Sequence, residues 1–476
     1  MSYKVIIVGA GSGGAQLAYE LARRDIEVVL YEQSSFSKLG HDWSDAVDKG
    51  ALLQAGFSLP RRQDGRWVGS NVKNENKETN REEVLFEPHV IDPLLVYSPD
   101  FQAVKEIKFP LIVTDRRDLN QALVRRAEKA GAEVKYQHRG EKLIVKKKGK
   151  GLTGVKVSGV KIKDLKTGKI KESRADLVVE ADGFNSSLRT SLPFKDNLTT
   201  YFKEEDFALV YREVRSFNPG QLERKLPDYY RYGYCGGYQW IHKHTANKID
   251  IGAGVAALGD WPDPEEIVKK IANRNPAVGA DKLRGGGGKC LVGPPLFNFA
   301  APGFLVIGDA ASMAVPTTGC GTGTAFQAAI FGGKVIAEAA RERRNDLAKL
   351  WDFNSYFYRP GGRGSHLAAL AAVRIMLQNI SQQEINDLYH YDLLKSVVLE
   401  KMVKGEFYLP NALDRIKALF RGAFCPKLLV KLSRLMKLAF EIFNHYQDYP
   451  QKWNRERYFS WREEAEELFS KARNFI

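Results

Sequence analysis

The chain has 476 residues, of which 44% are hydrophobic, and a formal net charge of +15 at pH 7. This length predicts two or three domains, and the apolar fraction excludes an intrinsically disordered protein. Four scattered cysteines without a Cys-x-x-Cys pair exclude a disulfide-rich scaffold and indicate no metal site, although one isolated bridge stays compatible with them. A basic balance is typical of proteins that bind nucleic acid, an anionic membrane or an acidic substrate, and also of ordinary solvated surfaces.

Neither end of the sequence indicates export or membrane insertion. The first apolar run, Val5 to Val8, is too short for the core of a signal peptide. No run approaches the roughly 20 apolar residues of a spanning helix. We therefore expect a cytoplasmic protein.

The first forty residues have the pattern of a dinucleotide-binding βαβ unit. Residues 4–8 are mostly β-branched, as in a buried parallel strand, and are followed by a GxGxxG turn. A helix with small apolar residues on one face comes next, and residues 27–32 form a second expected strand. Strand, glycine turn, helix and second strand at this spacing predict a bound adenine dinucleotide.

Each glycine of the GxGxxG turn has its own physical role. Gly9 permits the tight turn, Gly11 lets the backbone approach a pyrophosphate, and Gly14 lets helix and strand pack closely. The helix N-terminus offers unpaired N–H groups and partial positive charge to the phosphates. Glu32, at the end of the second strand, can accept hydrogen bonds from ribose hydroxyls. The cofactor-binding residues expected in this segment are Gly9, Gly11, Ser12, Gly13, Gly14, Glu32 and Gln33.

Two later motifs follow expected strands. Residues 175–181 lead into Asp182-Gly183, and residues 303–307 lead into Gly308-Asp309. A glycine-rich run to Gly323 and a long helix over about 324–344 come next. In this order, the three motifs resemble the flavoprotein family that includes p-hydroxybenzoate hydroxylase and the geranylgeranyl reductases, over about residues 1–345.

This resemblance implies FAD as the cofactor and roles for several side chains. Asp309 is implied to bind a ribityl hydroxyl, and Asp182 to lie near the pyrophosphate. The stretch Asp115 to Leu119 resembles the family's short arginine motif, with Arg117 near the flavin chain in preference to Arg116. Independently, backbone N–H groups at the start of the long helix would stabilise the negative charge of a reduced flavin. The cofactor-binding residues expected here are Arg117, Asp182, Gly183, Gly308, Asp309, Gly319, Cys320, Gly321 and Thr322.

From about residue 198 to 255, apolar and polar residues alternate, as in an antiparallel sheet. Period two places Tyr238, Trp240 and His242 on one face. This stretch resembles the geranylgeranyl reductase signature Tyr-x-Trp-x-Phe-Pro followed by Gly-x-Gly. Tyr238 and Trp240 match its aromatic residues, and Gly252 and Gly254 match its glycines. Aromatic faces of this kind line prenyl-sized pockets, and they also occur in ordinary cores.

Two departures from the family pattern concern the chemistry. His242 and Lys243 stand in place of Phe-Pro, and the stretch from Ser37 to Trp43 lacks the Pro-Cys-Gly of many members. His41 or Asp42 could face the site instead and supply a proton. A water held by the Gly319–Gly321 backbone is an equal alternative. The catalytic candidates are His41, Asp42, Tyr238 and Trp240.

Beyond residue 344 the sequence is helical, aromatic and basic. Residues 401–440 carry nine Lys or Arg and two acids, interleaved with apolar residues at helical spacing. A basic amphipathic helix is typical of an anionic membrane interface, and equally of a helix packed on the protein with its lysines in water. We expect the lysine-rich stretch 146–171 to be a solvated hairpin and Gly285–Gly288 to be a mobile loop.

The sequence thus predicts an α/β protein with a doubly wound, Rossmann-like FAD domain, an antiparallel-sheet substrate domain and a helical C-terminal region. The FAD domain is expected to combine residues 1–60, 110–195 and 290–345. Residues 61–109 and 196–289 are assigned to the substrate domain, and 346–476 to the helical region.

The function implied by the resemblance is reduction of isoprenoid C=C bonds in prenyl (geranylgeranyl) lipids by hydride from reduced FAD. Expected partners are the prenyl lipid, an electron donor such as NAD(P)H or ferredoxin, and an anionic membrane surface. The protein would lie peripherally on the inner face of that membrane. No nucleic-acid-binding module is recognised. Two alternatives remain: a FAD-dependent monooxygenase of an aromatic or lipid substrate, without the Trp-x-Trp-x-Ile-Pro of halogenases, and a membrane-associated electron-transfer flavoprotein.

Overall fold

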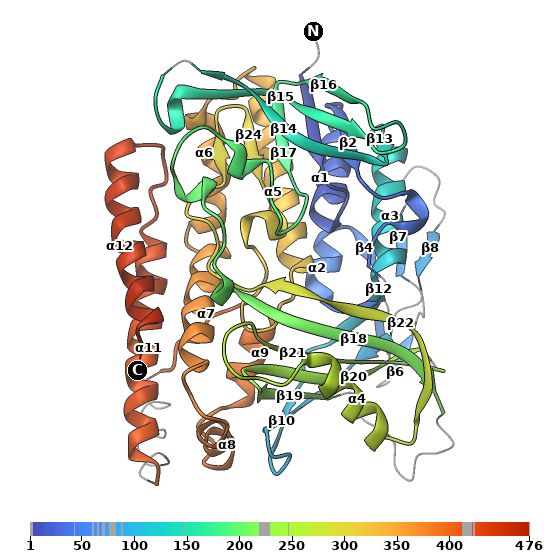
Figure 1. Ribbon diagram of the computed structural model, residues 1–476, viewed down its shortest axis with the longest axis vertical. Helices are drawn as coiled ribbons and strands as arrows, with labels where there is room; N and C mark the ends of the chain where they lie inside the picture. Colours follow the sequence, from blue (N-terminus) through green and yellow to red (C-terminus); the bar gives the residue numbers. More distant parts are fainter. Residues whose placement is uncertain are drawn as a thin grey trace.

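The computed structural model describes residues 3–41, 43–59, 61–63, 66–68, 72–75, 82–86, 89–147, 149–218, 229–245, 247–411, 421 and 424–475. A parallel sheet occupies one half of the molecule, an antiparallel sheet crosses the other half, and C-terminal helices run along one side (Figure 1). This is the α/β architecture with two sheets and a helical C-terminal region that the sequence predicts.

The first sheet has the strand order β13-β2-β1-β17-β24-β23. All neighbours are parallel except the last pair. Its strands are β13 (Glu133–Tyr136), β2 (Glu27–Glu32), β1 (Lys4–Val8), β17 (Leu177–Glu180), β24 (Phe304–Val306) and β23 (Ala300–Ala301). The carboxyl ends of β1, β17 and β24 are adjacent, so the turns that follow them meet at one edge of the sheet, where α/β proteins bind ligands.

Helices cover this sheet and begin at the same edge. Helix α1 (Ser12–Ala22) packs against α5 (Thr322–Arg341) and α3 (Arg116–Lys129). Gly333 allows a close approach of α5 to α1, because a Cβ there would lie 2.8 Å from the Cβ of Glu20. Helix α5 also packs against α6 (Leu347–Tyr358). The long helix expected over about 324–344 is confirmed, and it begins two residues and ends three residues earlier than expected.

The second sheet has the order β11-β10-β19-β20-β21-β18-β22 and is antiparallel except for the β10–β19 pair. Its strands are β11 (Val104–Ile107), β10 (Leu94–Tyr97), β19 (Tyr229–Tyr234), β20 (Gly237–Thr245), β21 (Lys248–Ala256), β18 (Phe207–Phe217) and β22 (Val278–Leu291). A smaller sheet of β3 (Ser44–Asp48), β12 (Leu111–Asp115) and β9 (His89–Ile91) lies between the two. The alternation in the sequence predicts the long antiparallel strands correctly.

The expectation of a mobile loop at Gly285–Gly288 is wrong. These glycines lie inside β22 and pair with β18, from Gly285 opposite Glu213 to Gly288 opposite Val210. Gly285 has φ +136°, and a Cβ there would lie 2.2 Å from the carbonyl oxygen of Arg212. Gly285 permits a close approach of β22 to β18, a requirement that local sequence does not reveal.

The lysine-rich stretch is a solvated sheet, as expected. Strands β14 (His138–Lys147), β15 (Val155–Asp164) and β16 (Ile170–Arg174) pair antiparallel, with most of their lysines exposed or half-buried.

The C-terminal region is helical, as predicted. It contains α6, α7 (Gly364–Leu377), α8 (Gln382–His390), α9 (Ser396–Val403), α11 (Pro426–Gln447) and α12 (Arg455–Arg473). Aromatic side chains join it to the rest of the core: the ring of Tyr358 stacks on that of Phe299 with centroids 5.4 Å apart, and the Tyr449 hydroxyl donates to the Phe297 carbonyl at 2.9 Å. Among the described residues, no helix combines the length and apolarity needed to cross a bilayer.

Candidate active site

A cavity of about 1840 Å³ extends from the edge of the parallel sheet, past the aromatic face of β20, to the C-terminal helices. Its first part is lined by the glycine turn after β1 and by the turns after β17 and β24. Its far part, the apolar chamber, is lined by side chains of α7, α8, α9 and α11. The chamber includes Val373, Leu388, Val398, Met402, Leu432 and Met436. A polar edge therefore continues into an apolar space.

The glycine turn has the geometry expected of a dinucleotide site. Gly9 has φ +101°, and a Cβ there would lie 2.3 Å from the carbonyl oxygen of Ala181. A Cβ on Gly14 would lie 1.9 Å from the carbonyl oxygen of Gly9, so Gly14 packs the helix onto the turn. Gly9, Gly11, Ser12 and Gly13 line the cavity. The turn therefore offers bare backbone and a helix N-terminus to a ligand.

Glu32 and Gln33 lie beside this turn and line the cavity. The buried Glu32 carboxylate accepts the N–H groups of Ala10 at 2.8 Å and Ser34 at 2.7 Å. These bonds hold the acid at the end of β2, next to the glycine turn, which is where a ribose would need an acceptor.

Asp182 and Asp309, with Gly183 and Gly308, line the cavity on the neighbouring turns. Burial raises the pKa of the Asp182 carboxyl to about 6, and it also raises the pKa of Asp309, which Arg116 partly opposes. Within the described part of the chain, the buried Oδ1 of Asp182 has no hydrogen-bond partner. A buried acceptor without a partner fits a site in which a bound group donates the missing hydrogen bond. A hydroxyl of FAD or an ordered water could be that donor.

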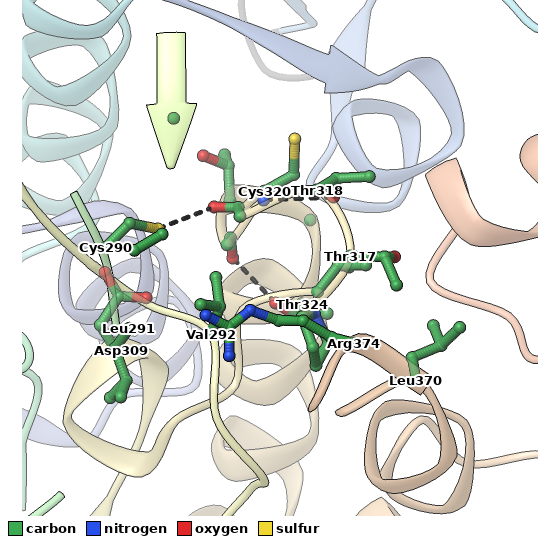
Figure 2. Close-up of a pocket in the computed structure, with 18 of the residues that line it drawn as sticks. Cys290, Leu291, Val292, Asp309, Thr317, Thr318, Cys320, Thr324, Leu370 and Arg374 are labelled. Carbon is green, nitrogen blue, oxygen red and sulfur yellow. Dashed lines mark hydrogen bonds between the residues drawn. The ribbon is translucent and has the colours of Figure 1, made fainter. Parts of the chain in front are cut away.

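The loop before α5 forms the next part of the wall (Figure 2). Gly319, Cys320, Gly321 and Thr322 all line the cavity. Figure 2 shows Thr317, Thr318 and Cys320 of this segment. The Cys320 thiol faces the cavity and donates to the carbonyl of Ala46 at 3.8 Å, and burial raises its pKa to about 11. The thiol is therefore protonated at neutral pH. We name residues 316–323 the flavin loop.

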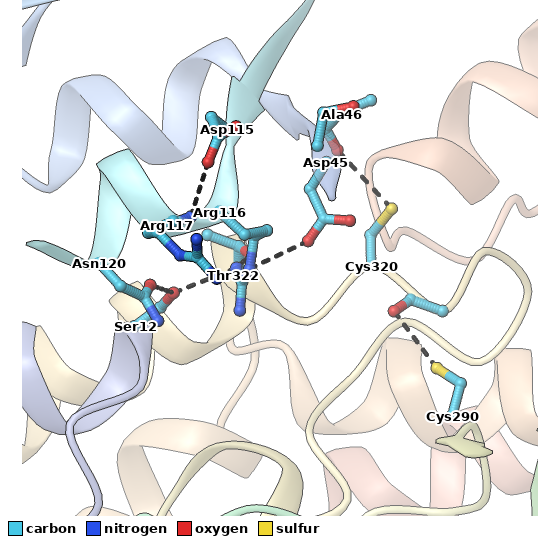
Figure 3. A network of polar contacts seen from close by, with 12 residues as sticks. Ser12, Asp45, Ala46, Asp115, Arg116, Arg117, Asn120, Cys290, Cys320 and Thr322 are labelled. Carbon is cyan, nitrogen blue, oxygen red and sulfur yellow. Dashed lines mark hydrogen bonds and ion pairs between the residues drawn. The ribbon is translucent and has the colours of Figure 1, made fainter. Parts of the chain in front are cut away.

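Of the neighbouring residues Arg116 and Arg117, it is Arg116 that lines the cavity (Figure 3). Its guanidinium donates to the hydroxyls of Ser12 at 3.2 Å and Thr322 at 2.5 Å, and it lies 3.3 Å from the Asp45 carboxylate. Asp115 caps α3 by accepting the N–H of Arg117 at 2.9 Å. Consecutive helical residues point about 100° apart, so the point where α3 begins decides which arginine faces inward.

Tyr238, Trp240 and His242 lie on one face of β20 and line the cavity, as period two predicts. The Tyr238 hydroxyl donates to the Thr318 carbonyl of the flavin loop. The Trp240 indole lies flat over β21, where a Cβ on Gly252 would come within 2.0 Å of its ring. Gly252 is therefore needed for the position of the indole.

A buried polar cluster behind this wall was not predicted from the sequence. Asp250, fully buried, accepts the Trp240 indole N–H and the Ser44 hydroxyl, each at 2.7 Å. His242 Nε2 lies 3.7 Å from the same carboxylate. An acid at an inward position of an otherwise apolar strand, Ile249 to Ala256, was the available signal.

Asp45 is the second unpredicted residue of this wall. It lies between two arginines, with Arg212 at 2.8 Å and Arg116 at 3.3 Å. Burial alone would raise the pKa of the Asp45 carboxyl, but the charges of Arg116 and Arg212 outweigh it and lower that pKa. Asp45 is therefore ionised at neutral pH and links the cofactor edge to the substrate-side sheet.

His41 lines the cavity, with its ring stacked on Trp43 at a centroid distance of 4.2 Å. Asp42, the other candidate proton donor, lies outside the described residues. The four cysteines are all free thiols.

Comparison with known proteins agrees with this geometry. Residues 7–67 match the family model of an NAD(P)-binding Rossmann-like domain. The chain is 26% identical to a digeranylgeranylglycerophospholipid reductase of Sulfolobus acidocaldarius, over 99% of this chain and 98% of that protein. It is 24% identical to digeranylgeranylglycerophospholipid reductase 2 of Methanococcoides burtonii, over 91% of this chain and 96% of the relative.

Solved structures show the same fold. A geranylgeranyl bacteriochlorophyll reductase-like protein of Thermoplasma acidophilum superposes with a TM-score of 0.67 at 16% identity, covering 91% of this chain and 99% of that one. A myxobacterial FAD-dependent chondrochloren halogenase superposes with a TM-score of 0.57 at 16% identity, covering 100% and 97%. The full-length relatives, the three motifs and the cavity together show that this chain resembles the geranylgeranyl reductase family of FAD-dependent oxidoreductases.

Proposed function

We propose that the protein saturates isoprenoid C=C bonds of a prenyl lipid, with geranylgeranyl chains as its substrates. The observation that carries this proposal is the continuity of the cavity, which joins the dinucleotide edge to the apolar chamber past Tyr238 and Trp240. A prenyl chain needs a long and mainly apolar space, and Val373, Leu388 and Met402 are among the apolar side chains with which four helices line the chamber. The names of the full-length relatives support the same substrate class.

FAD fits the residues at the sheet edge. The glycine turn would hold the pyrophosphate, Glu32 a ribose and Asp309 the ribityl chain, while Asp182 offers an unused acceptor. Arg116 would take the place foreseen for Arg117, because Arg116 lines the cavity and contacts Ser12 beside the glycine turn. Bound and reduced, FAD would supply hydride to an alkene carbon.

The chain's own residues orient the substrate and exclude water. Tyr238 is fixed by its bond to Thr318, and Trp240 by its bond to Asp250, so both rings present rigid walls. A proton must reach the second alkene carbon. His41, Asp42 and a water on the Gly319–Gly321 backbone remain the candidates, and the position of His41 among the lining residues of the cavity supports its candidacy.

We assign the parallel-sheet segments 1–60, 110–195 and 290–345 to cofactor binding, 61–109 and 196–289 to the substrate wall, and 346–476 to the lipid-binding helices. The protein would work in the cytoplasm, peripherally on the inner face of an anionic membrane, because its substrate resides in the bilayer. A reductant such as NAD(P)H or ferredoxin would reload the flavin.

The deciding experiment mixes photoreduced holoenzyme with a geranylgeranyl lipid under argon and follows the product by mass spectrometry. Saturated lipid formed without oxygen supports the reductase. Turnover that requires oxygen would instead identify a monooxygenase. Rapid electron exchange with a partner, without any altered lipid, would identify an electron-transfer flavoprotein.

A further inference from the structure

The cavity reaches the surface in a second place, far from the cofactor edge. Among its lining residues, Gln33 and Ser187 are exposed near the glycine turn and the turn after β17. A separate set of exposed lining residues belongs to the segment before residue 411 and to α11: Leu409, Ser433, Lys437 and Phe440. The apolar chamber therefore has its own opening beside α11.

Large apolar side chains are exposed around this opening. Phe424 is 77% exposed, Val430 52%, Leu409 44% and Phe440 40%. The Phe424 ring stacks on the half-exposed Tyr391, with centroids 5.9 Å apart. Single exposed apolar residues are ordinary, but a group around the mouth of an apolar cavity indicates contact with another apolar phase.

Cations share this surface. Lys427, Val430, Arg434 and Lys437 follow one another at steps of three or four along α11, so they lie on one exposed face. The opposite face buries Leu428, Leu435, Ala439 and Ile442, and α11 packs on α7. Within the described residues, no ion pair joins Lys427 or Arg434 to a carboxylate. Figure 1 shows α11 near the outer edge of the molecule.

We propose that this surface docks on an anionic bilayer and that the opening is the portal through which a prenyl chain enters, an inference that rests on the proposed function. The portal face consists of Leu409, Phe424, Lys427, Val430, Arg434, Lys437 and Phe440. Its apolar side chains insert among the lipid chains, and its cations contact anionic head groups. A chain that passes directly from the bilayer into the apolar chamber is never exposed to water, so its transfer avoids the cost of hydrating an apolar surface.

Docking is tested by co-sedimentation of the holoenzyme with vesicles of equimolar phosphatidylcholine and phosphatidylglycerol. Each cation near an anionic surface contributes about 1 kcal/mol, or about fivefold in affinity, so K427E/R434E/K437E should weaken binding on the order of 100-fold. Phe424→Ser should weaken binding at any salt concentration, because its contribution is apolar. The matched controls lie on the solvated hairpin: K166E/K169E/K171E for charge, and Ile170→Ser, at 57% exposure, for apolar area.

The portal is tested with Ser433→Trp, which places a large ring at the rim of the opening. The variant should retain FAD absorbance and vesicle binding but take up geranylgeraniol from vesicles at least about tenfold more slowly. Ile170→Trp is the control. Equal binding of the wild type to neutral and anionic vesicles, or equal losses in the control variants, would overturn docking. Unchanged uptake in Ser433→Trp would overturn the portal. A protein that docks and takes up the lipid but reduces nothing would refute the proposed function alone.

Discussion

The hydroxyl of Tyr238 donates a hydrogen bond to the main-chain carbonyl of Thr318, joining the substrate-side sheet to the flavin loop. A strand residue predicted to line the substrate space therefore also braces the segment that would contact the flavin. Movement on one side of the cavity is limited by the other, which suits a reaction that needs a fixed distance between hydride donor and alkene.

Tyr238→Phe keeps the ring and removes this bond. We expect a loss of about 1 kcal/mol in the free energy of unfolding and a lower kcat with little change in KM, because the wall becomes less well fixed. Thermal unfolding and steady-state kinetics of the variant measure both. Tyr232→Phe, which stays in the same aromatic cluster, is the control. A Tyr238→Phe enzyme with wild-type kcat would show that the bond has no role in catalysis.

Arg116 and Arg117 should differ in their effect on FAD binding. Arg116 contacts Ser12, Thr322 and Asp45 at the cavity, so Arg116→Ala should weaken FAD binding by about 10- to 100-fold through lost charge-assisted hydrogen bonds. Arg117→Ala should change it by less than about threefold. Flavin fluorescence titration of the apoprotein measures both constants. The reverse order of effects would restore the role that the sequence motif implies for Arg117.

Asp182 should make the apoprotein less stable as pH rises. Its folded pKa, about 6, lies above the unfolded value, so the folded state binds more protons between about pH 4 and 6 and stability falls across that window. Asp182→Asn removes the buried charge, and it should stabilise the apoprotein at pH 7 by roughly 1–3 kcal/mol while weakening FAD binding. Urea unfolding at pH 4.5 and pH 7 tests the sign, and equal effects at both values would contradict it.

Asp45 should have the opposite pH dependence. Its folded pKa lies below the unfolded value because of Arg116 and Arg212, so its contribution to stability is present above about pH 4 and is lost as pH falls further. Asp45→Asn should therefore lose stability at neutral pH and show a shallower decline in acid. Urea midpoints from pH 3 to pH 7 measure both slopes. Parallel curves for the two proteins would show that the ion pairs make no net contribution.

The cofactor edge was predictable from local sequence, because each part of it is a short strand followed by a turn whose residues are chosen by backbone geometry. Gly14 is required by the carbonyl of Gly9 in the same turn, and the carboxyl ends of parallel strands meet at one edge whatever the rest of the chain does. The aromatic face of β20 was predictable for a similar reason, since period two places Tyr238 and Trp240 together.

Tertiary structure alone decided which residues come into contact across long separations in the sequence. Asp45 meets Arg212, and Ser44 meets Asp250, only because β3 lies against the substrate-side sheet. The residue at which α3 begins decided that Arg116 faces the cavity. Pairing with β18 decided that Gly285–Gly288, which resemble a loop in sequence, form part of a strand. The sequence by itself determined the dinucleotide edge and the periodic faces, because these depend on neighbouring residues. Strand register and helix phase determined the ion pairs, the glycine strand and the second opening, because these depend on which distant segments are packed together.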